Sequence, residues 1–325
     1  MTPRTRIAIA ALAAFAMMTG TAAAQSYPSR PITVLIPFAG GSASDVAARI
    51  VFAQMSKTLG QPIIIENRPG AGGNSGTAQA AKAAPDGYTL VGGGSGPIAA
   101  NVTLYKDLGY DPQKDFTMIS PFVSFTVVIT ASNKLGVNSV QELIERARKE
   151  PGALNYGSVG IGSSQHLAGE YFAQVTGVKM THVPYRNIAQ FGPDMIAGTV
   201  PLGFAWYPNV AGPLNANAAK ALAVAGDKRL ATLPDTPTTT EVNLAEYKVD
   251  GWFGLAAPAG VPKDILERLN KELNAALNDP GLRANFEKVG AVPFGLGLEE
   301  SKAFLANEIA KYRDIITKAG IAKIE

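Results

Sequence analysis

Short apolar runs alternate with helix-like segments along this chain, and this alternation constrains the fold most strongly. Pro31–Pro37 (PITVLIP), Pro62–Glu66 (PIIIE) and Tyr88–Gly92 (YTLVG) have the length and β-branched composition of buried strands. Val46–Leu59 and Asn74–Ala84 lie between them and have the composition of helices. Strands that alternate with helices form a mostly parallel sheet flanked by helices. We therefore predict an α/β fold.

The alternation continues through the rest of the chain. Its 325 residues are long enough for two domains, and a hydrophobic content of 46% is enough to bury a core in each. The helices that we predict here are Val140–Lys149, a segment starting near Gln165, Lys263–Leu277, and about Leu298 to Ala319. The predicted strands are Phe122–Ala131, Leu154–Ser158, Lys179–Val183, Val200–Phe204, Ala219–Ala225 and Gly251–Pro258.

Residues 1–24 have the features of a secretory signal. Arg4 and Arg6 precede the uncharged apolar run Ile7–Met18, and the small residues up to Ala24 fit the signal-cleavage rule. The alternative is a transmembrane anchor, but this run is well short of the roughly 20 apolar residues that a spanning helix needs. We therefore expect an exported protein, cleaved near Ala24.

The composition disfavours several classes of function. The formal net charge is +3 and no Lys/Arg-rich run occurs, so we expect no nucleic-acid partner. The chain has no cysteine, which excludes disulfides, thiolate metal sites and a lipid-modified cysteine. Its two histidines, His166 and His182, are too few for a multi-histidine metal site. We expect no metal and no cofactor.

Three loops share one design, in which Gly and hydroxyl residues follow a predicted strand and precede a helix. They are Ala39–Asp45, Gly92–Gly96 and Gly157–Ser164. A helix N-terminus has unpaired N–H groups and a partial positive charge, so it can bind an anion without a basic side chain. Two such loops across a cleft could hold both ends of a dicarboxylate. The alternative is that they are ordinary turns in which serine caps a helix.

Catalytic motifs are absent or incomplete. The Gly93–Pro97 segment ends in proline and so does not form a G-x-S-x-G elbow, and no phosphate-binding G-x-x-x-x-G-K motif occurs. Gly94–Ala99 formally matches a dinucleotide fingerprint, but Pro97 lacks the backbone N–H that a pyrophosphate needs. We therefore expect a binding protein and not an enzyme.

Three ring side chains have open roles at this point. His166 falls in the first turn of its predicted helix, where it can contact a ligand, act as a base or serve the structure. His182 lies at the end of a predicted strand, which favours a structural role. Trp206 follows a strand and can line a cleft or belong to the core.

Eight short motifs occur in a specific order along the chain. They are Tyr27–Ile32, Pro37–Asp45, Glu66–Gly73, Pro85–Leu90, Tyr156–Leu167, His182–Tyr185, Trp252–Leu255 and Ala257–Gly260. Together they resemble the Bug-type solute receptors of tripartite tricarboxylate transporters. The resemblance implies a two-lobed periplasmic binding protein of the type II, Venus-flytrap kind, in which each lobe is a mostly parallel sheet flanked by helices. Lobe 1 would comprise 26–124 and 251–325, and lobe 2 would comprise 125–250.

The resemblance also implies which residues clamp the ligand. Backbone N–H groups, serine hydroxyls and waters of the first loop and of the Gly157–Ser164 loop would hold a carboxylate. Asp45 would orient the loop or a water, or pair with a ligand ammonium. The candidate contacts are Phe38, Gly41, Ser42, Ser44, Asp45, Ser95, Ser158, Gly162, Ser163 and Ser164, to which we add His166 and Trp206.

The implied function is capture of a small organic anion in the periplasm for the membrane subunits of such a transporter. A mono-, di- or tricarboxylate, including an aromatic one, fits this site, and the protein is expected to be a monomer. The alternative is a periplasmic sensor that presents its closed form to a signalling partner. Four positions depart from the family pattern: Ser42 replaces a common glycine, Asn187 follows Arg186 in place of glycine, Pro201 replaces a common aspartate, and Trp206 is bulkier than usual.

Overall fold

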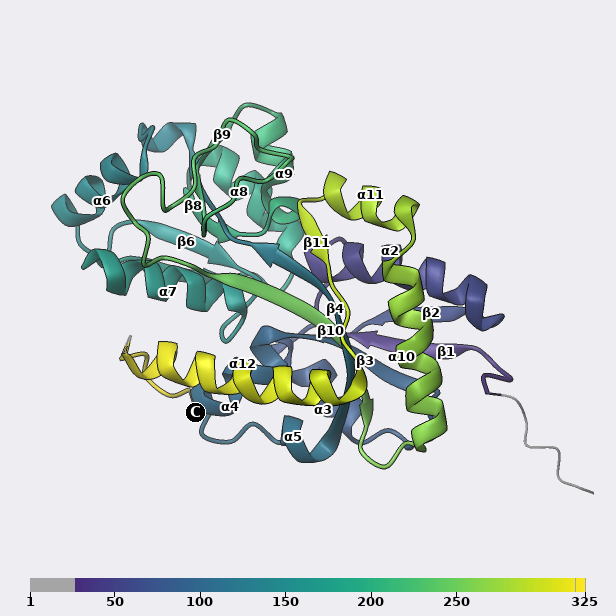
Figure 1. The fold of residues 1–325 in the computed structure, drawn as a ribbon. Helices are drawn as coiled ribbons and strands as arrows, with labels where there is room; N and C mark the ends of the chain where they lie inside the picture. The colour runs from purple at the N-terminus through teal and green to yellow at the C-terminus, as the bar shows by residue number, and fades with distance from the viewer. Residues whose placement is uncertain (1–26, 319, 325) are drawn as a thin grey trace, which may run out of the picture.

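The computed structural model describes residues 27–318 and 320–324 and contains two β-sheets with helices packed around each (Figure 1). The predicted secretory signal and Ala319 lie outside the described residues. The α/β fold with two lobes is confirmed: one sheet has six strands and the other has five.

The six-stranded sheet defines the first lobe. Its strand order is β11-β4-β10-β3-β1-β2. β1 pairs with β2 and β3 in parallel, whereas β10 pairs with β3 and β4, and β11 with β4, in antiparallel orientation. The strands are β1 Ile32–Ile36, β2 Ile63–Asn67, β3 Thr89–Gly94, β4 Phe116–Thr126, β10 Asp250–Pro258 and β11 Ala291–Pro293.

The five-stranded sheet defines the second lobe and has the order β7-β6-β8-β5-β9. β6 pairs with β7 and β8 in parallel, and β5 pairs with β8 and β9 in antiparallel orientation. The prediction of mostly parallel sheets is therefore wrong. Each sheet is mixed, because the strands next to the crossings between lobes run antiparallel to their neighbours. The strands are β5 Val128–Ser132, β6 Asn155–Ser158, β7 Thr181–Pro184, β8 Leu202–Ala205 and β9 Ala219–Val224.

The single long strand predicted over Phe122–Ala131 is wrong. The chain breaks at the buried Val127, so that β4 ends in the first sheet and β5 begins in the second. A continuous β-branched run does not reveal that its two halves pair with different sheets. The Val127 N–H donates to the carbonyl of Val249, 3.4 Å away, which places the two crossings between lobes side by side.

The helices follow the predicted pattern in most places. Val140–Lys149 and Lys263–Leu277 have the predicted bounds, and the last helix starts at Leu298 as expected. Within the described residues, five α-helices were not predicted. α4 and α5 are only four residues long, and glycine and proline interrupt the sequences of α8, α9 and α11. The helices are α2 Ala43–Leu59, α3 Asn74–Ala81, α4 Asn101–Leu104, α5 Pro112–Asp115, α6 Val140–Lys149, α7 Ser164–Thr176, α8 Phe191–Ala197, α9 Tyr207–Asn215, α10 Lys263–Leu277, α11 Pro280–Lys288 and α12 Leu298–Lys318.

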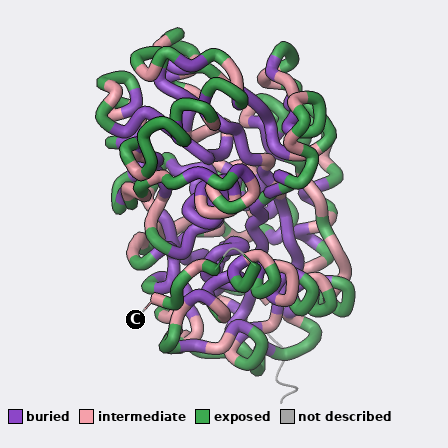
Figure 2. Tube along the Cα trace, turned by 90° about the vertical axis from the view of Figure 1, so that its left-hand side faces the viewer, coloured by how far each residue is buried: buried purple, intermediate pink, exposed green. Residues whose placement is uncertain are grey.

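The buried core follows the strands and continues from one lobe into the other. Figure 2 shows buried backbone running through both halves, with exposed segments around it. An aromatic cluster lies at the junction of the lobes. The Trp206 ring stacks on Phe125 with a centroid separation of 5.4 Å and meets Phe253 edge-on at 5.1 Å.

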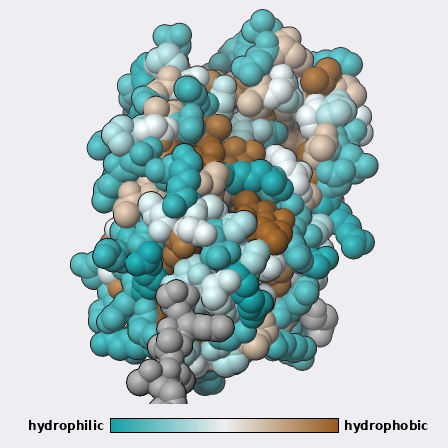
Figure 3. All heavy atoms as spheres, turned by 90° about the vertical axis from the view of Figure 1, so that its right-hand side faces the viewer, coloured by the Kyte–Doolittle hydropathy of each residue, from teal (hydrophilic) through white to brown (hydrophobic). Residues whose placement is uncertain are grey.

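The outer surface is mostly polar. On the face shown in Figure 3, hydrophilic surface surrounds separate apolar patches. The large apolar side chains that reach the surface come from different elements, as is ordinary for a folded protein. Within the described residues, no helix combines the length and apolar character that crossing a membrane requires. The same residues bring together no group of three His, Cys, Asp or Glu side chains able to hold a metal ion.

Candidate functional site

A cavity of about 690 Å³ lies between the two lobes. This volume falls within the range of roughly 300–1,000 Å³ that is usual for small-molecule sites. Most of its wall comes from the segments that follow β1, β2, β6 and β7, and Tyr105 after α4 and Ile324 after α12 complete it. The first lobe contributes Pro37, Phe38, Ala39, Ser42, Pro69, Gly70, Ala71, Gly72, Ser75, Tyr105 and Ile324, and the second contributes Val159, Gly160, Ile161, Pro184, Tyr185, Arg186 and Ile188.

The first loop brings the N-terminus of α2 to this cavity. Ser42 has extended backbone angles and caps the helix, accepting a hydrogen bond from the Asp45 N–H at 3.4 Å. Its hydroxyl also lies 2.9 Å from that of Ser44. Phe38 and Ser42 are the two predicted contacts on the cavity wall. A neutral polar group at the positive end of a helix is suited to receive an anion.

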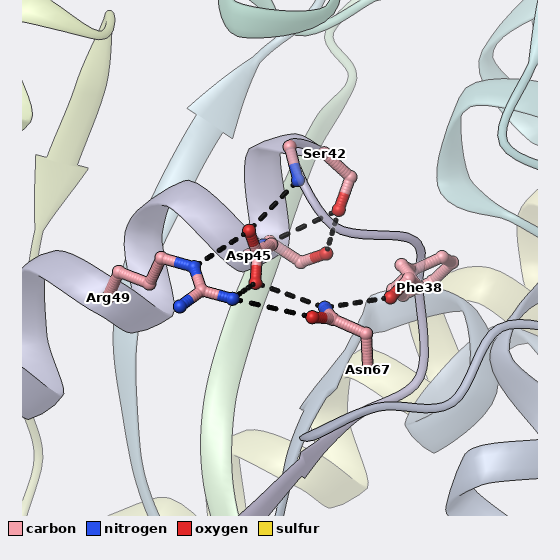
Figure 4. Close-up of polar contacts among 7 residues, drawn as sticks. Phe38, Ser42, Asp45, Arg49 and Asn67 are labelled. Atoms are coloured by element: carbon pink, nitrogen blue, oxygen red, sulfur yellow. Dashed lines mark hydrogen bonds and ion pairs between the residues drawn. The ribbon is translucent and has the colours of Figure 1, made fainter. Parts of the chain in front are cut away.

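Asp45 holds the first loop in place (Figure 4). Its carboxylate accepts hydrogen bonds from the Gly41 N–H at 2.9 Å and from the Asn67 side chain at 3.0 Å, and it pairs with Arg49 at 2.9 Å. Burial alone would raise the pKa of Asp45, but these bonds outweigh burial and lower it. Both oxygens are therefore engaged within the protein, which supports the expected role of orienting the loop.

The second loop is held by the two histidines. Ser163 caps α7 by accepting from the His166 N–H at 3.3 Å, and His166 Nδ1 accepts from the Gly162 N–H at 3.3 Å. His182 Nε2 lies 2.6 Å from the Ser158 hydroxyl, and the two imidazole rings are 4.2 Å apart. Burial lowers the pKa of His166 to about 4. Burial and the neighbouring His166 lower the pKa of His182 to about 3, so both rings are neutral at pH 7.

The two lobes touch directly beside the cavity. The Ala43 N–H donates to Asn209 Oδ1 at 3.1 Å, and the Tyr105 hydroxyl donates to the Ile161 carbonyl at 3.2 Å. A Cβ added at Gly72 would lie 2.0 Å from that same carbonyl oxygen. The lobes are thus in a closed arrangement, in which the backbone at Gly72 of the first lobe packs against the backbone at Ile161 of the second.

Several predicted contacts lie at this junction of the lobes and not on the wall of the cavity. Ser95, Ser163 and Ser164 are almost fully buried, and the Ser95 hydroxyl is 2.6 Å from that of Ser164. Ser158 is also buried, but its hydroxyl contacts His182 and the Gly160 carbonyl within the second lobe. Gly162 also belongs to the junction, since its Cβ position is 2.7 Å from the side-chain oxygen of Asn101.

The remaining predicted contacts lie apart from the cavity wall. Gly41 lines a separate cavity of about 400 Å³ together with Asn209. His166 is buried beneath its loop, and Trp206 is only 3% exposed within the aromatic cluster between the lobes. The core position of Trp206 corresponds to one of the two roles left open by the sequence.

Sequence reasoning missed part of the cavity wall. Tyr105, Tyr185 and Arg186 line it, although none was predicted as a contact. The motif Glu66–Gly73 identified the family without indicating that Pro69–Gly72 face the cavity. Arg186 follows a recognised motif directly, which is the signal that could have suggested it.

Comparison with known proteins decides the family. Residues 47–321 match the sequence model of the tripartite tricarboxylate transporter family receptor. The chain belongs to this family. It is 31% identical to Protein BugT of Bordetella pertussis over 316 residues, which cover 96% of this chain and 97% of BugT. The family consists of periplasmic solute receptors and not of enzymes.

Solved structures of related receptors have the same fold. One is Rpa4515 of R. palustris with adipate, which superposes with a TM-score of 0.88 at 34% identity and covers 92% of this chain and 100% of its own. Another is MatC from Rhodopseudomonas palustris with bound malate, with a TM-score of 0.83 at 31% identity, covering 89% of this chain and 100% of its own. The two-lobed binding-protein fold of the receptor is thereby established.

Proposed function

We propose that this receptor captures a small organic carboxylate in the cavity between its lobes and presents it to the membrane subunits of a tripartite tricarboxylate transporter. The ligand class comprises mono-, di- and tricarboxylates, including aromatic ones. Secretion with cleavage near Ala24 and a monomeric state belong to the same proposal. So does the division into lobe 1 (26–124 and 251–325) and lobe 2 (125–250).

The observation that carries this proposal is the capped N-terminus of α2 at a cavity formed by both lobes. Ser42 is at once the helix cap and part of the cavity wall. Its helix contributes a partial positive charge, and hydrogen bonds from uncharged donors to a carboxylate contribute roughly 1.5–3 kcal/mol each. The adipate and malate bound by the two related receptors support a carboxylate ligand.

Capture by closure accounts for the contacts between lobes. The bonds from Ala43 to Asn209 and from Tyr105 to Ile161 join different lobes, so they form when the receptor closes. A ligand shifts the receptor towards this state only if it binds the closed form more tightly than the open form. A carboxylate that contacts both lobes meets this condition, because in the open form it can contact only one of the two lobes.

A thermal-shift screen tests the proposed function. The protein without its signal segment is unfolded and refolded to remove bound ligand, then melted with aliphatic and aromatic carboxylates. A ligand at 100 times its Kd adds about 2.7 kcal/mol, and each kcal/mol raises Tm by roughly 2–4 °C for a chain of this size. A rise with one class of carboxylate supports the proposal. A cooperative melt that no carboxylate shifts contradicts it and indicates a neutral or cationic ligand.

A further inference from the structure

Among the described residues that line the cavity, only Arg186 has a charged side chain. It is exposed, and within residues 27–318 and 320–324 it has no ion-pair partner. No aspartate or glutamate of the described chain shares the cavity wall with it. The cavity therefore has an uncompensated positive charge on the side of the second lobe.

Other arginines near the first loop are already neutralised. Arg49 pairs with Asp45 at 2.9 Å, and Arg68 pairs with Glu66 at 2.6 Å. Neither arginine lines the cavity. An anion in the cavity would therefore find its free cationic partner at Arg186.

The backbone on both sides of Arg186 is fixed, although its side chain is exposed. The Tyr185 N–H donates to the Ser158 carbonyl at 2.9 Å, and the Tyr185 hydroxyl donates to Asp194 at 2.6 Å. On the other side, the Asn187 side chain accepts from the Ala189 N–H at 3.2 Å. The Cα of Arg186 thus has a fixed place beside the cavity, so that only its side chain has to be ordered when a ligand binds.

Apolar side chains line the same cavity as Ser42 and Arg186. Phe38 of the first lobe and Val159, Tyr185 and Ile188 of the second lobe contribute to it. A hydrocarbon segment in contact with these side chains is removed from water, which contributes roughly 25 cal/mol for each Å² buried. The cavity therefore combines two places that favour negative charge with apolar side chains on the same wall.

We infer that Arg186 determines specificity by binding a second anionic group of the ligand, so that the receptor prefers a dicarboxylate with an apolar spacer over the matching monocarboxylate. This inference rests on the proposed function, in which the first carboxylate lies at the N-terminus of α2. Arginine suits the role because its planar guanidinium can bind a carboxylate through two hydrogen bonds.

Isothermal titration calorimetry at low ionic strength tests the inference. The probes are straight-chain dicarboxylates of four to eight carbons, each compared with the monocarboxylate of the same length. The wild type should bind at least one dicarboxylate about tenfold more tightly than its matched monocarboxylate. Arg186→Gln should weaken that dicarboxylate about tenfold and change the monocarboxylate less than about twofold, and Arg186→Lys should retain part of the preference.

Arg68→Gln is the matched control, because it removes the same charge from a paired arginine outside the cavity. It should leave the preference unchanged. The inference is overturned if Arg186→Gln preserves the preference, if Arg68→Gln abolishes it equally, or if the wild type binds carboxylates without any preference. A wild type that binds no carboxylate at all overturns the proposed function together with the inference.

Discussion

The hydroxyl oxygens of Ser95 and Ser164 lie 2.6 Å apart, although the two residues belong to different lobes. Ser95 follows β3 in the first lobe, and Ser164 is the first residue of α7 in the second. Both side chains are almost fully buried. This hydrogen bond exists only while the lobes are closed, so the ends of two Gly/Ser loops form part of the closing surface.

The first prediction concerns Gly96, which follows Ser95. A Cβ at this position would lie 2.8 Å from the Gly162 carbonyl oxygen of the other lobe. Gly96→Ala should therefore disfavour closure and weaken carboxylate binding by at least about tenfold, with little effect on the melting of the ligand-free protein. Calorimetric titration and thermal melts measure the two effects.

Gly212→Ala is the control for Gly96→Ala, because a Cβ at Gly212 meets no atom within 4 Å. It should bind ligand like the wild type. Wild-type affinity in Gly96→Ala would contradict the account of closure.

The second prediction separates the two roles considered for Asp45. If this carboxylate orients the first loop, Asp45→Asn should weaken all carboxylates by a similar factor and lower the free energy of unfolding by about 1–3 kcal/mol. If it pairs with a ligand ammonium, only amino-acid ligands should lose affinity. Titration with a carboxylate and with the amino acid of the same length distinguishes the two. Asp86→Asn, which breaks an exposed ion pair with Arg30, should have little effect.

The fold was largely predictable because hydrophobic periodicity and turn residues act locally. The helices Val140–Lys149 and Lys263–Leu277 have strongly amphipathic sequences, and their bounds were found without the structure. The break at Val127 was not predictable, since it depends on which sheet each half of one β-branched run joins.

The candidate site was predictable only in part. Ser42 could be placed at a helix start because its loop has a local signature, and it does line the cavity. Whether Ser95 and Ser164 face a cavity or each other depends on how the lobes meet, which no local pattern specifies. Arg186 directly follows a recognised motif, but the motif does not show which of the residues beside it line the cavity.

The third prediction tests whether Trp206 belongs to the core. Its ring is packed between Phe125 and Phe253, and its indole N–H is buried without a partner. Trp206→Ala should lower the free energy of unfolding by about 3–5 kcal/mol, whereas Trp206→Phe should cost less than about 1.5 kcal/mol. Urea unfolding of the ligand-free proteins measures both. Normal stability in Trp206→Ala, combined with lost binding, would instead identify Trp206 as a ligand contact.

The fourth prediction concerns pH. The pKa is about 4 for His166 and about 3 for His182 in the folded protein, against about 6.5 for an unfolded histidine. Between these values the unfolded chain binds more protons, so stability is retained above pH 6.5 and falls as the pH drops towards 4. The slope is at most about 1.4 kcal/mol per pH unit for each histidine.

Urea midpoints at pH 7.5 and pH 5 measure this dependence. Glu170 lies 4.0 Å from His166 and its carboxylate accepts a hydrogen bond from Tyr156, so Glu170 also faces the histidine pair. Replacing both histidines by glutamine should reduce the loss of stability at pH 5, since glutamine does not titrate. An unchanged loss in the double variant would assign the pH dependence to other groups.

Closure around a carboxylate is the central claim, and small-angle X-ray scattering tests it most directly. The refolded, ligand-free receptor is measured before and after saturation with the carboxylate that raises its Tm most. The account predicts a smaller radius of gyration with ligand and a scattering curve that matches the closed arrangement of the lobes. An unchanged curve from open lobes at full occupancy would contradict it.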